Sequence, residues 1–204
     1  MEDQVRVILI GGSSHVGKTT LARFLAQRPG WKHVSTDSLA RHPGRPWQTP
    51  PMSVPAHVSE HYLSLTVDEL MDSVLAHYRK MGPMIHALIT AHSSGPVRLV
   101  LEGSALWPQS VAAVDLPGVA GIWLTTGDDL FASRIYRESR FDEPDATGKA
   151  LIAKFLERTR RYDREMMASV KRLGLPHLNV ETTPSIDALA DACLAQMAPL
   201  SRLG

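Results

Sequence analysis

Eight residues near the start of the chain have the types and the spacing needed to bind phosphate. They read G-x-x-x-x-G-K-T, after an apolar run at 5–10 and before an apolar-periodic segment that begins at Thr20. Glycines let the main chain curl so that successive N–H groups face phosphate oxygens, and the N-terminus of the following helix adds partial positive charge. The residues expected to hold nucleotide phosphates are Gly12, Ser13, Ser14, His15, Val16, Gly17, Lys18, Thr19 and Thr20.

Lys18 and Thr19 have separate roles in this pattern. The lysine ammonium reaches the β- and γ-phosphates of a nucleoside triphosphate, and the threonine hydroxyl binds Mg²⁺. The alternative is a glycine-rich turn before an ordinary helix. The complete octet between a predicted strand and a predicted helix favours the phosphate-binding loop, so we expect ATP and Mg²⁺ as cofactors.

Two acidic residues follow apolar segments, and ligands of open α/β sheets bind beyond the carboxyl ends of the strands. Asp37 follows the segment 32–36 and is a candidate general base for an acceptor hydroxyl, or a group that holds a metal-bound water. Its alternative role is a helix N-cap. Glu102 closes the segment 97–102 and is a candidate Mg²⁺ ligand, directly or through water, or else a cap of the following turn.

Three arginines recur at three-residue spacing around a polar segment, 138–148, that interrupts two predicted helices. On one helical face, guanidinium groups would close over phosphates and offset charge in the transition state. We therefore interpret 138–148 as a lid, with Arg137 and Arg140 as catalytic residues and Arg134 as a nucleotide-binding residue. A solvated charged face is the alternative.

A proline-rich stretch and a long helical stretch predict an insertion on the acceptor side. Residues 43–55 are too rich in proline for a helix, and 56–94 add more chain than a plain crossover between two strands requires. Aromatic and basic residues in or near it are candidates for an acceptor pocket, although buried packing fits the aromatic ones equally well. These candidates are Arg41, Trp47, His57, Tyr62 and Trp107. Arg158, Arg160 and Arg161 are weaker candidates than the lid arginines for contact with phosphate and are expected at the surface.

Five short apolar segments alternate with helical patterns, which predicts a parallel sheet with helices on both faces. The predicted strands are 5–10, 32–36, 97–102, 119–125 and 177–181.

Helix signals mark the segments between these strands. Thr66 and Glu69 form a capping box, and the helical spacing that follows is predicted to end at Gly82-Pro83. Thr126 and Thr183 are predicted caps of two later helices, Pro184 being placed in the first turn of the second, and apolar spacing predicts a long helix over 150–173.

Composition limits the class of protein. A chain of 204 residues with a net charge of +1 fits one domain, 1–204, and favours neither nucleic acid nor a membrane surface as a partner. The single cysteine, Cys193, falls on a predicted core face, and without a signal-peptide pattern we expect a cytoplasmic protein. His57 and His61 have an i, i+4 spacing but no HExxH arrangement, so we expect no metal site at that pair.

Together these motifs resemble the P-loop small-molecule kinases. The segments 10–19, 35–37 and 101–108 are similar to successive motifs of the 2-phosphoglycerate kinase-like group, near chloramphenicol phosphotransferase-like proteins, and 160–163 before 174–176 looks like its closing helix and strand. The resemblance implies a three-layer α/β sandwich with a five-stranded parallel sheet in the order 2-3-1-4-5. It also implies that the turn containing Thr182 and Pro184 lies against adenine.

The residues and the resemblance imply an ATP-dependent kinase that transfers the γ-phosphoryl group to a hydroxyl of a small molecule, such as a hydroxy acid, a sugar or an antibiotic. Positioning and electrostatics would supply most of the catalysis. A regulatory NTPase or nucleotide-binding switch is the alternative, but the sequence has no Asn-Lys-x-Asp motif to read guanine. A degenerate binding scaffold is a third possibility, which the intact Lys18 and Glu102 disfavour. We expect a monomer or homodimer whose partner is the small-molecule acceptor.

Overall fold

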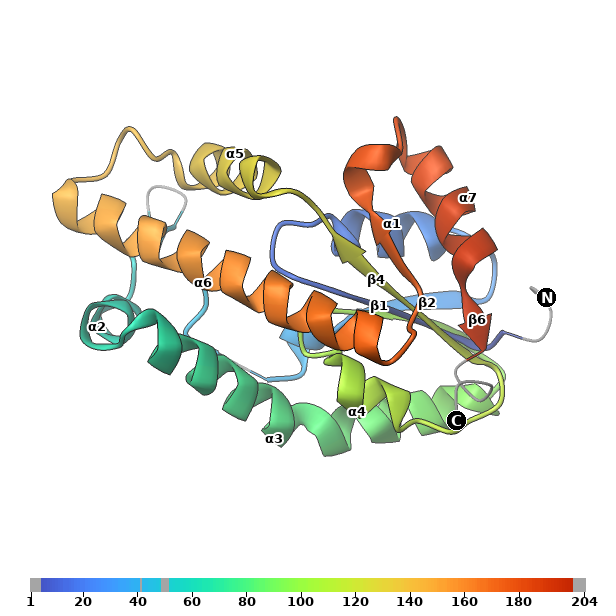
Figure 1. The fold of residues 1–204 in the computed structure, drawn as a ribbon. Helices are drawn as coiled ribbons and strands as arrows, with labels where there is room; N and C mark the ends of the chain where they lie inside the picture. The colour runs from blue at the N-terminus through green and yellow to red at the C-terminus, as the bar shows by residue number, and fades with distance from the viewer. Residues whose placement is uncertain (1–4, 41, 49–51, 200–204) are drawn as a thin grey trace.

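A parallel sheet lies between two layers of helices in the computed structural model, which describes residues 5–40, 42–48 and 52–199 (Figure 1). The sheet order is β2-β3-β1-β4-β5 with every neighbouring pair parallel, so the predicted order is confirmed. A short β6 adds an antiparallel pair to β4. The strands are β1 (Val7–Gly12), β2 (Trp31–Ser35), β3 (Arg98–Glu102), β4 (Val119–Thr125), β5 (His177–Asn179) and β6 (Ala198–Pro199).

Helices cover both faces of the sheet, with α1 and α7 on one side and α3, α4 and the C-terminal half of α6 on the other (Figure 1). The helices are α1 (Lys18–Leu25), α2 (Ala56–Ser64), α3 (Val67–Ser93), α4 (Pro108–Ala112), α5 (Asp128–Ser139), α6 (Ala146–Arg172) and α7 (Ile186–Gln196). Two single 3₁₀ turns, η2 (Thr36–Ser38) and η3 (Val180–Thr182), follow β2 and β5.

The alternation of side chains along the central strand explains why its sequence is apolar throughout. In β1, Ile8 and Ile10 pack into the core on the α1 side, and Leu9 packs into the core on the α3 side. A strand buried on both faces has no position where a polar side chain would reach water. The continuous apolar run that predicted a buried strand therefore reflects helices on both sides.

Close packing at the end of β1 fixes the start of the phosphate-binding loop. The indole Nε1 of Trp123 in β4 donates a hydrogen bond of 3.0 Å to the carbonyl of Leu106. A Cβ on Gly11 would lie only 2.3 Å from that nitrogen, and Gly12 has a φ of +142° with no room for a Cβ beside the carbonyl of Leu124. Glycine at both positions lets β1 approach β4 and then turn into the loop.

The helix predicted to end at Gly82-Pro83 continues to Ser93, so that boundary is wrong. Proline inside a helix costs about 3 kcal/mol because it removes one backbone hydrogen bond and crowds the preceding turn. Here Met81, Ile85 and Ile89 form one buried stripe across the proline, and their burial offsets that cost. The capping box of Thr66 and Glu69 at the start of α3 is confirmed.

Three other helix starts differ from prediction. The Thr126 hydroxyl donates to the carboxylate of Glu181, which lies after β5, instead of capping α5. Ser185 caps α7, so Thr183 is not its cap and Pro184 does not lie in its first turn.

The third difference changes the size of the predicted lid. Helix α6 begins at Ala146 with Asp145 as its cap, so the connection from α5 to α6 spans only residues 140–145.

Cys193 is buried on the core face of α7, as predicted. Within the described ranges, none of the helices has the length and the apolar character that crossing a bilayer requires.

Substitution at Gly11 tests the close packing. We expect Gly11→Ala to lower the free energy of unfolding by about 1–3 kcal/mol, because the new methyl group overlaps the buried indole of Trp123. Gly82→Ala is the matched control, since a Cβ there meets nothing within 4 Å beyond its chain neighbours. It should change stability far less than Gly11→Ala, because the gain in helix propensity is opposed by the crowding of Pro83 against the new Cβ. Urea unfolding measures both values, and an unchanged midpoint for Gly11→Ala would contradict the packing account.

Candidate active site

The loop between β1 and α1 folds around the Lys18 side chain. Gly17, with a φ of 102°, turns the chain into α1, and Lys18 is only 7% exposed. Its Nζ donates a hydrogen bond of 2.7 Å to the carbonyl of Ser13. Burial lowers the pKa of the Lys18 ammonium from its ordinary value, and the carboxylates of Glu102 and Asp37 oppose that shift. The loop thus holds a lysine with two acidic groups near it.

Thr19 and Glu102 meet beside this lysine. The Thr19 Oγ1 donates to the Oε1 of Glu102 at 3.1 Å, and Glu102 is 2% exposed. A threonine hydroxyl and a carboxylate are hard oxygen donors, which suit Mg²⁺ that retains waters and binds nucleotide phosphates. In the described ranges, His, Cys, Asp and Glu side chains form no group of three that could hold a metal by themselves. These two residues would therefore hold the ion together with the nucleotide.

The strand register explains why the acidic residues meet the loop. Glu102 at the end of β3 lies opposite Ile10 of β1 and Ser35 of β2. Asp37 is two residues beyond Ser35, in η2, so it emerges at the same edge of the sheet. The Ser35 side chain is the cap of η2 and accepts from the N–H of Asp37 at 3.4 Å, so Asp37 is not the N-cap.

A pocket of about 760 Å³ opens over the loop. It brings together most of the predicted nucleotide and metal residues with Asp37 and two of the three arginines. The predicted residues that line it are Ser14, His15, Val16, Gly17, Lys18, Thr19, Thr20, Asp37, Glu102, Arg134, Arg137 and Pro184.

Four predicted residues do not line this pocket. Gly12 and Ser13 are buried, and Ser13 Oγ donates to the carbonyl of Thr159 at 3.2 Å. The Thr182 hydroxyl donates to the carbonyl of Asn179. Arg140 ends α5 in the left-handed conformation, with φ 49°, and its side chain is 54% exposed and lies 3.6 Å from Glu143. The three-residue spacing therefore places Arg134 and Arg137 at the site but not Arg140.

Arg134 supports the loop from α5. Its Nη1 donates a hydrogen bond of 2.8 Å to the carbonyl of His15, a residue in the left-handed conformation with φ 63°. Positive φ is uncommon for residues other than glycine, although histidine is among the types enriched there. The hydrogen bond from Arg134 ties this turn of the loop to α5.

Glu138 joins three parts of the site that are distant in the sequence. One carboxylate oxygen lies 3.0 Å from Nε2 of His15, and the other pairs with Arg45. The carboxylate thus links the phosphate loop, α5 and the segment before α2. Sequence reasoning missed Glu138 and Arg45, because an isolated charge in a polar segment carries no signal of a partner about 90 residues away.

A second cavity, of about 280 Å³, adjoins the first through three shared residues, Ser14, Asp37 and Arg45. It lies between the segment before α2, helix α3 and helix α6. Its remaining lining residues are Ala40, His42, Gly44, Val74, His77, Tyr78, Met81, Phe155 and Arg158. We name it the α3–α6 cavity.

Arg158, expected at the surface, is 9% exposed and lines this cavity, so that expectation is wrong. Phe155 and Tyr162, three residues before it and four after it, lie on the buried face of α6. The helical spacing therefore contained the signal, which its positive charge obscured. Arg160 and Arg161 are partly exposed and pair with carboxylates, in keeping with their expected place at the surface.

The other predicted acceptor residues have separate positions. Tyr62 is fully buried next to Arg158, and Trp47 packs edge-on against Phe155. Trp107 lines a different, apolar cavity between α3 and α4. His57 is exposed, and Arg41 lies outside the described residues.

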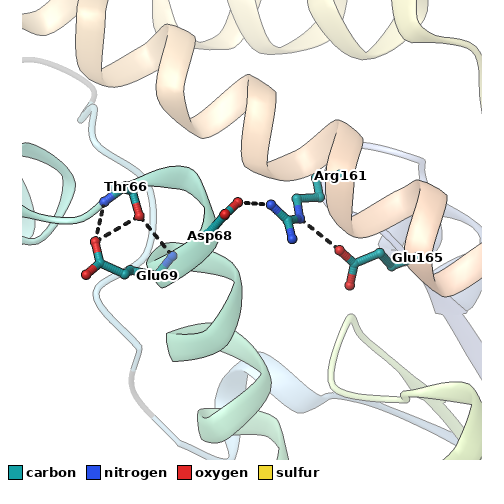
Figure 2. A network of polar contacts seen from close by, with 5 residues as sticks. All are labelled: Thr66, Asp68, Glu69, Arg161 and Glu165. Atoms are coloured by element: carbon teal, nitrogen blue, oxygen red, sulfur yellow. Dashed lines mark hydrogen bonds and ion pairs between the residues drawn. The ribbon is translucent and has the colours of Figure 1, made fainter.

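Polar contacts outside the cavity hold α3 against α6 (Figure 2). Arg161 of α6 pairs with Asp68 in the first turn of α3 and with Glu165 one turn along α6. The capping box of Thr66 and Glu69 fixes the same first turn. These contacts set the position of α3, which forms one wall of the α3–α6 cavity.

No protein-family model and no curated protein sequence matches this chain. Among solved structures, a gluconokinase from Sinorhizobium meliloti 1021 is similar with a TM-score of 0.53 and 16% identity, over 97% of this chain and 92% of that one. A deoxyadenosine kinase from M. mycoides with bound dATP gives 0.50 and 12%, over 92% of this chain and 97% of that one. The chain has the fold of the P-loop kinases. At these identities, the likeness concerns the fold alone.

His42 lines the α3–α6 cavity and is largely shielded from water. Nδ1 of His42 accepts the N–H of Gly44 at 3.3 Å, and its Nε2 is buried without a hydrogen-bond partner. Burial, followed by Arg158 and the imidazoles of His77 and His61, lowers the pKa of His42 from 6.5 to about 3. The ring is therefore neutral near pH 7, with its proton on Nε2.

This pKa predicts acid sensitivity. The unfolded chain binds a proton at His42 below pH 6.5 and the folded protein does not until about pH 3, so stability is lost as pH falls from 6.5. We expect His42 to contribute a loss of about 1–2 kcal/mol between pH 7 and pH 5, and His42→Gln to remove it. Urea unfolding at both pH values measures the difference. His57→Gln, at an exposed position, is the control, and equal slopes for the His42 variant and the unaltered protein would refute the prediction.

Proposed function

We propose that this protein is an ATP-dependent kinase that transfers the γ-phosphoryl group to a hydroxyl of a small molecule. The observation that carries the proposal is the position of Asp37, which lines both the P-loop pocket and the α3–α6 cavity. One pocket has the residues for a triphosphate and Mg²⁺, and the adjoining cavity offers room for an acceptor. A carboxylate at their junction is where a general base belongs.

Each step of the phosphoryl transfer can be assigned to residues of this chain. P-loop amides and Lys18 hold the β- and γ-phosphates, while Thr19 and Glu102 would hold Mg²⁺, which neutralises phosphate charge when bound. The acceptor oxygen forms a bond to the γ-phosphorus as the bond to the ADP oxygen breaks, and Asp37 takes the acceptor's proton. Arg134 and Arg137 face the same pocket and offset the charge that develops on the transferred group.

The far end of the P-loop pocket suits a base. Pro184, predicted for adenine, lines it together with Val180, Ile186 and Leu189, so we assign the adenine to this apolar end. Thr182 does not line the pocket, since its hydroxyl donates to the carbonyl of Asn179, and we leave it out of that assignment. Arg140 and residues 140–145 remain proposed as a lid, with Arg140 reaching the site only on closure.

The comparisons support kinase chemistry in a general sense, since the two similar structures reported above are named as kinases. A regulatory NTPase remains the alternative, but it gives no role to a cavity that opens onto Asp37. The proposal includes a small-molecule acceptor as the partner, a monomer or homodimer, and a cytoplasmic location.

A thermal-shift screen of hydroxy acids, sugars and antibiotics, with Mg²⁺ and β,γ-imido-ATP present, identifies the acceptor. True acceptors raise the melting temperature beyond the effect of the nucleotide.

Lys18→Ala tests the P-loop. We expect it to abolish phosphoryl transfer to that acceptor and to weaken Mg·ATP binding at least about tenfold in calorimetry, because the ammonium that faces the phosphates is gone. Circular dichroism should show an intact fold. Lys171→Ala, at an exposed position in the last turn of α6, is the control and should retain full turnover. Turnover in the Lys18 variant would exclude this loop from the mechanism.

Asp37→Asn tests the general base. Turnover should fall about 100-fold or more, because the amide cannot take the acceptor's proton, while KM for ATP changes little. Steady-state kinetics at saturating acceptor measure both quantities. Asp142→Asn, an exposed carboxylate in the α5–α6 connection, serves as the control. If turnover in the Asp37 variant equals that of the control, the carboxylate has no part in proton transfer.

A further inference from the structure

The α3–α6 cavity contains a buried cation with few partners. Arg158 is 9% exposed, and its Nη1 donates to the Tyr62 hydroxyl at 3.0 Å. Among the residues that the structure describes, no carboxylate pairs with it and no other acceptor lies within hydrogen-bond distance. A guanidinium group has five N–H donors, and among the described residues Arg158 uses its side-chain donors only toward Tyr62. Because Arg158 lines the cavity, its remaining donors are available to a ligand that enters there.

The surroundings hold the guanidinium in a fixed orientation. The carbon Cζ lies 4.6 Å from the ring centre of Phe155 and 5.8 Å from that of Tyr62. Tyr62 is itself anchored, since its hydroxyl donates to the carbonyl of Gly44 at 2.7 Å. A guanidinium held this way loses little entropy when it forms two parallel hydrogen bonds to a planar oxyanion.

The histidines around Arg158 add a hydrogen-bond donor to the cavity but little positive charge. The unpartnered Nε2 of His42 is a further buried donor in the same cavity, and His77 lies with its ring centre 5.1 Å from that of His42. Because His42 is neutral near pH 7, Arg158 is the full cation at this end of the cavity. Arg45, at the other end, already pairs with Glu138. One guanidinium fits a singly charged carboxylate better than a doubly charged phosphate.

We propose that the acceptor is a small hydroxycarboxylic acid, with its carboxylate bound by Arg158 and His42 and its reactive hydroxyl at Asp37. This inference rests on the proposed kinase function and adds the substrate class and a specificity residue. The cavity of about 280 Å³ limits the acceptor to a compact molecule, because it must span from Arg158 to the residues shared with the P-loop pocket. Neutral polyols of the same skeleton leave the guanidinium unpaired and are rejected.

Paired probes test the carboxylate requirement in the whole protein. The acids are glycolate, D-glycerate and D-gluconate, and their neutral counterparts are ethylene glycol, glycerol and D-glucitol. Binding is measured by calorimetry with Mg²⁺ and β,γ-imido-ATP saturating the P-loop, and ATP-dependent phosphorylation by phosphorus NMR. We expect at least one acid to bind and to be phosphorylated, with its neutral counterpart bound at least about tenfold more weakly.

Variants of Arg158 locate the site. Arg158→Gln should weaken binding of that acid at least about tenfold and leave the affinity for Mg·ATP unchanged, while Arg172→Gln, exposed on the same helix, changes neither. Arg158→Lys keeps the charge without the planar fork, so it should show a smaller loss and provides the test if the glutamine variant does not fold. The inference is overturned if no acid binds, if acid and polyol bind equally, if glycerol 3-phosphate binds more tightly than D-glycerate, or if the Arg158 variants bind like the unaltered protein.

The kinase proposal and this inference fail in different ways. Phosphorylation of neutral polyols that the Arg158 variants retain would preserve the kinase and overturn the carboxylate assignment. Absence of Mg·ATP binding, in a protein that still binds an acid through Arg158, would overturn the kinase and leave the anion site. Lys18→Ala separates the two sites, because it should lose the nucleotide and retain the acid.

Discussion

The site depends on holding a lysine ammonium that is almost wholly buried at the floor of the P-loop pocket. An unpaired buried charge costs several kcal/mol, so the fold must bring compensating oxygens to Lys18. The carbonyl of Ser13 does so from within the loop, and the carboxylates of Glu102 and Asp37 do so from β3 and from the turn after β2. Parallel strands in the order β2-β3-β1 bring all three to one edge of the sheet. Held by these oxygens, the Lys18 ammonium lines the pocket where an anionic ligand would bind.

Helix α6 is long enough to pack into both hydrophobic cores of the protein. Its N-terminal half packs with α2 and the P-loop side of the core, and its C-terminal half packs with α3 and α4 on the other side. Arg158 lies near the change from one core to the other, and its aromatic neighbours bury it. A rigid helix holds a binding group more accurately than a loop does. This explains how a residue far from the phosphate loop in the sequence lines a cavity that adjoins the P-loop pocket.

Two carboxylates link the phosphate loop, the segment before α2 and the start of α5 to one another and to the end of the sheet. Glu138 contacts both His15 of the loop and Arg45 of the segment before α2, and Glu181 accepts the N–H of Gly127 and the hydroxyl of Thr126 at the start of α5. Both act between segments that the chain separates widely. The position of α5, and with it Arg134 and Arg137, therefore depends on contacts that no local pattern encodes.

The sequence by itself determined the sheet, the phosphate loop and the acidic residues beside it, because these depend on local chemistry. Apolar runs form buried strands, glycines permit the loop, Glu102 closes its strand, and Asp37 lies two residues beyond the end of its strand. Tertiary structure decided the continuation of α3 past Pro83, the caps of α5 and α7, the exclusion of Arg140 from the pocket and the burial of Arg158. The start of α5, the buried stripe of α3 and the burial of Arg158 depend on partners from distant segments. A sequence pattern records the residue but not what packs against it.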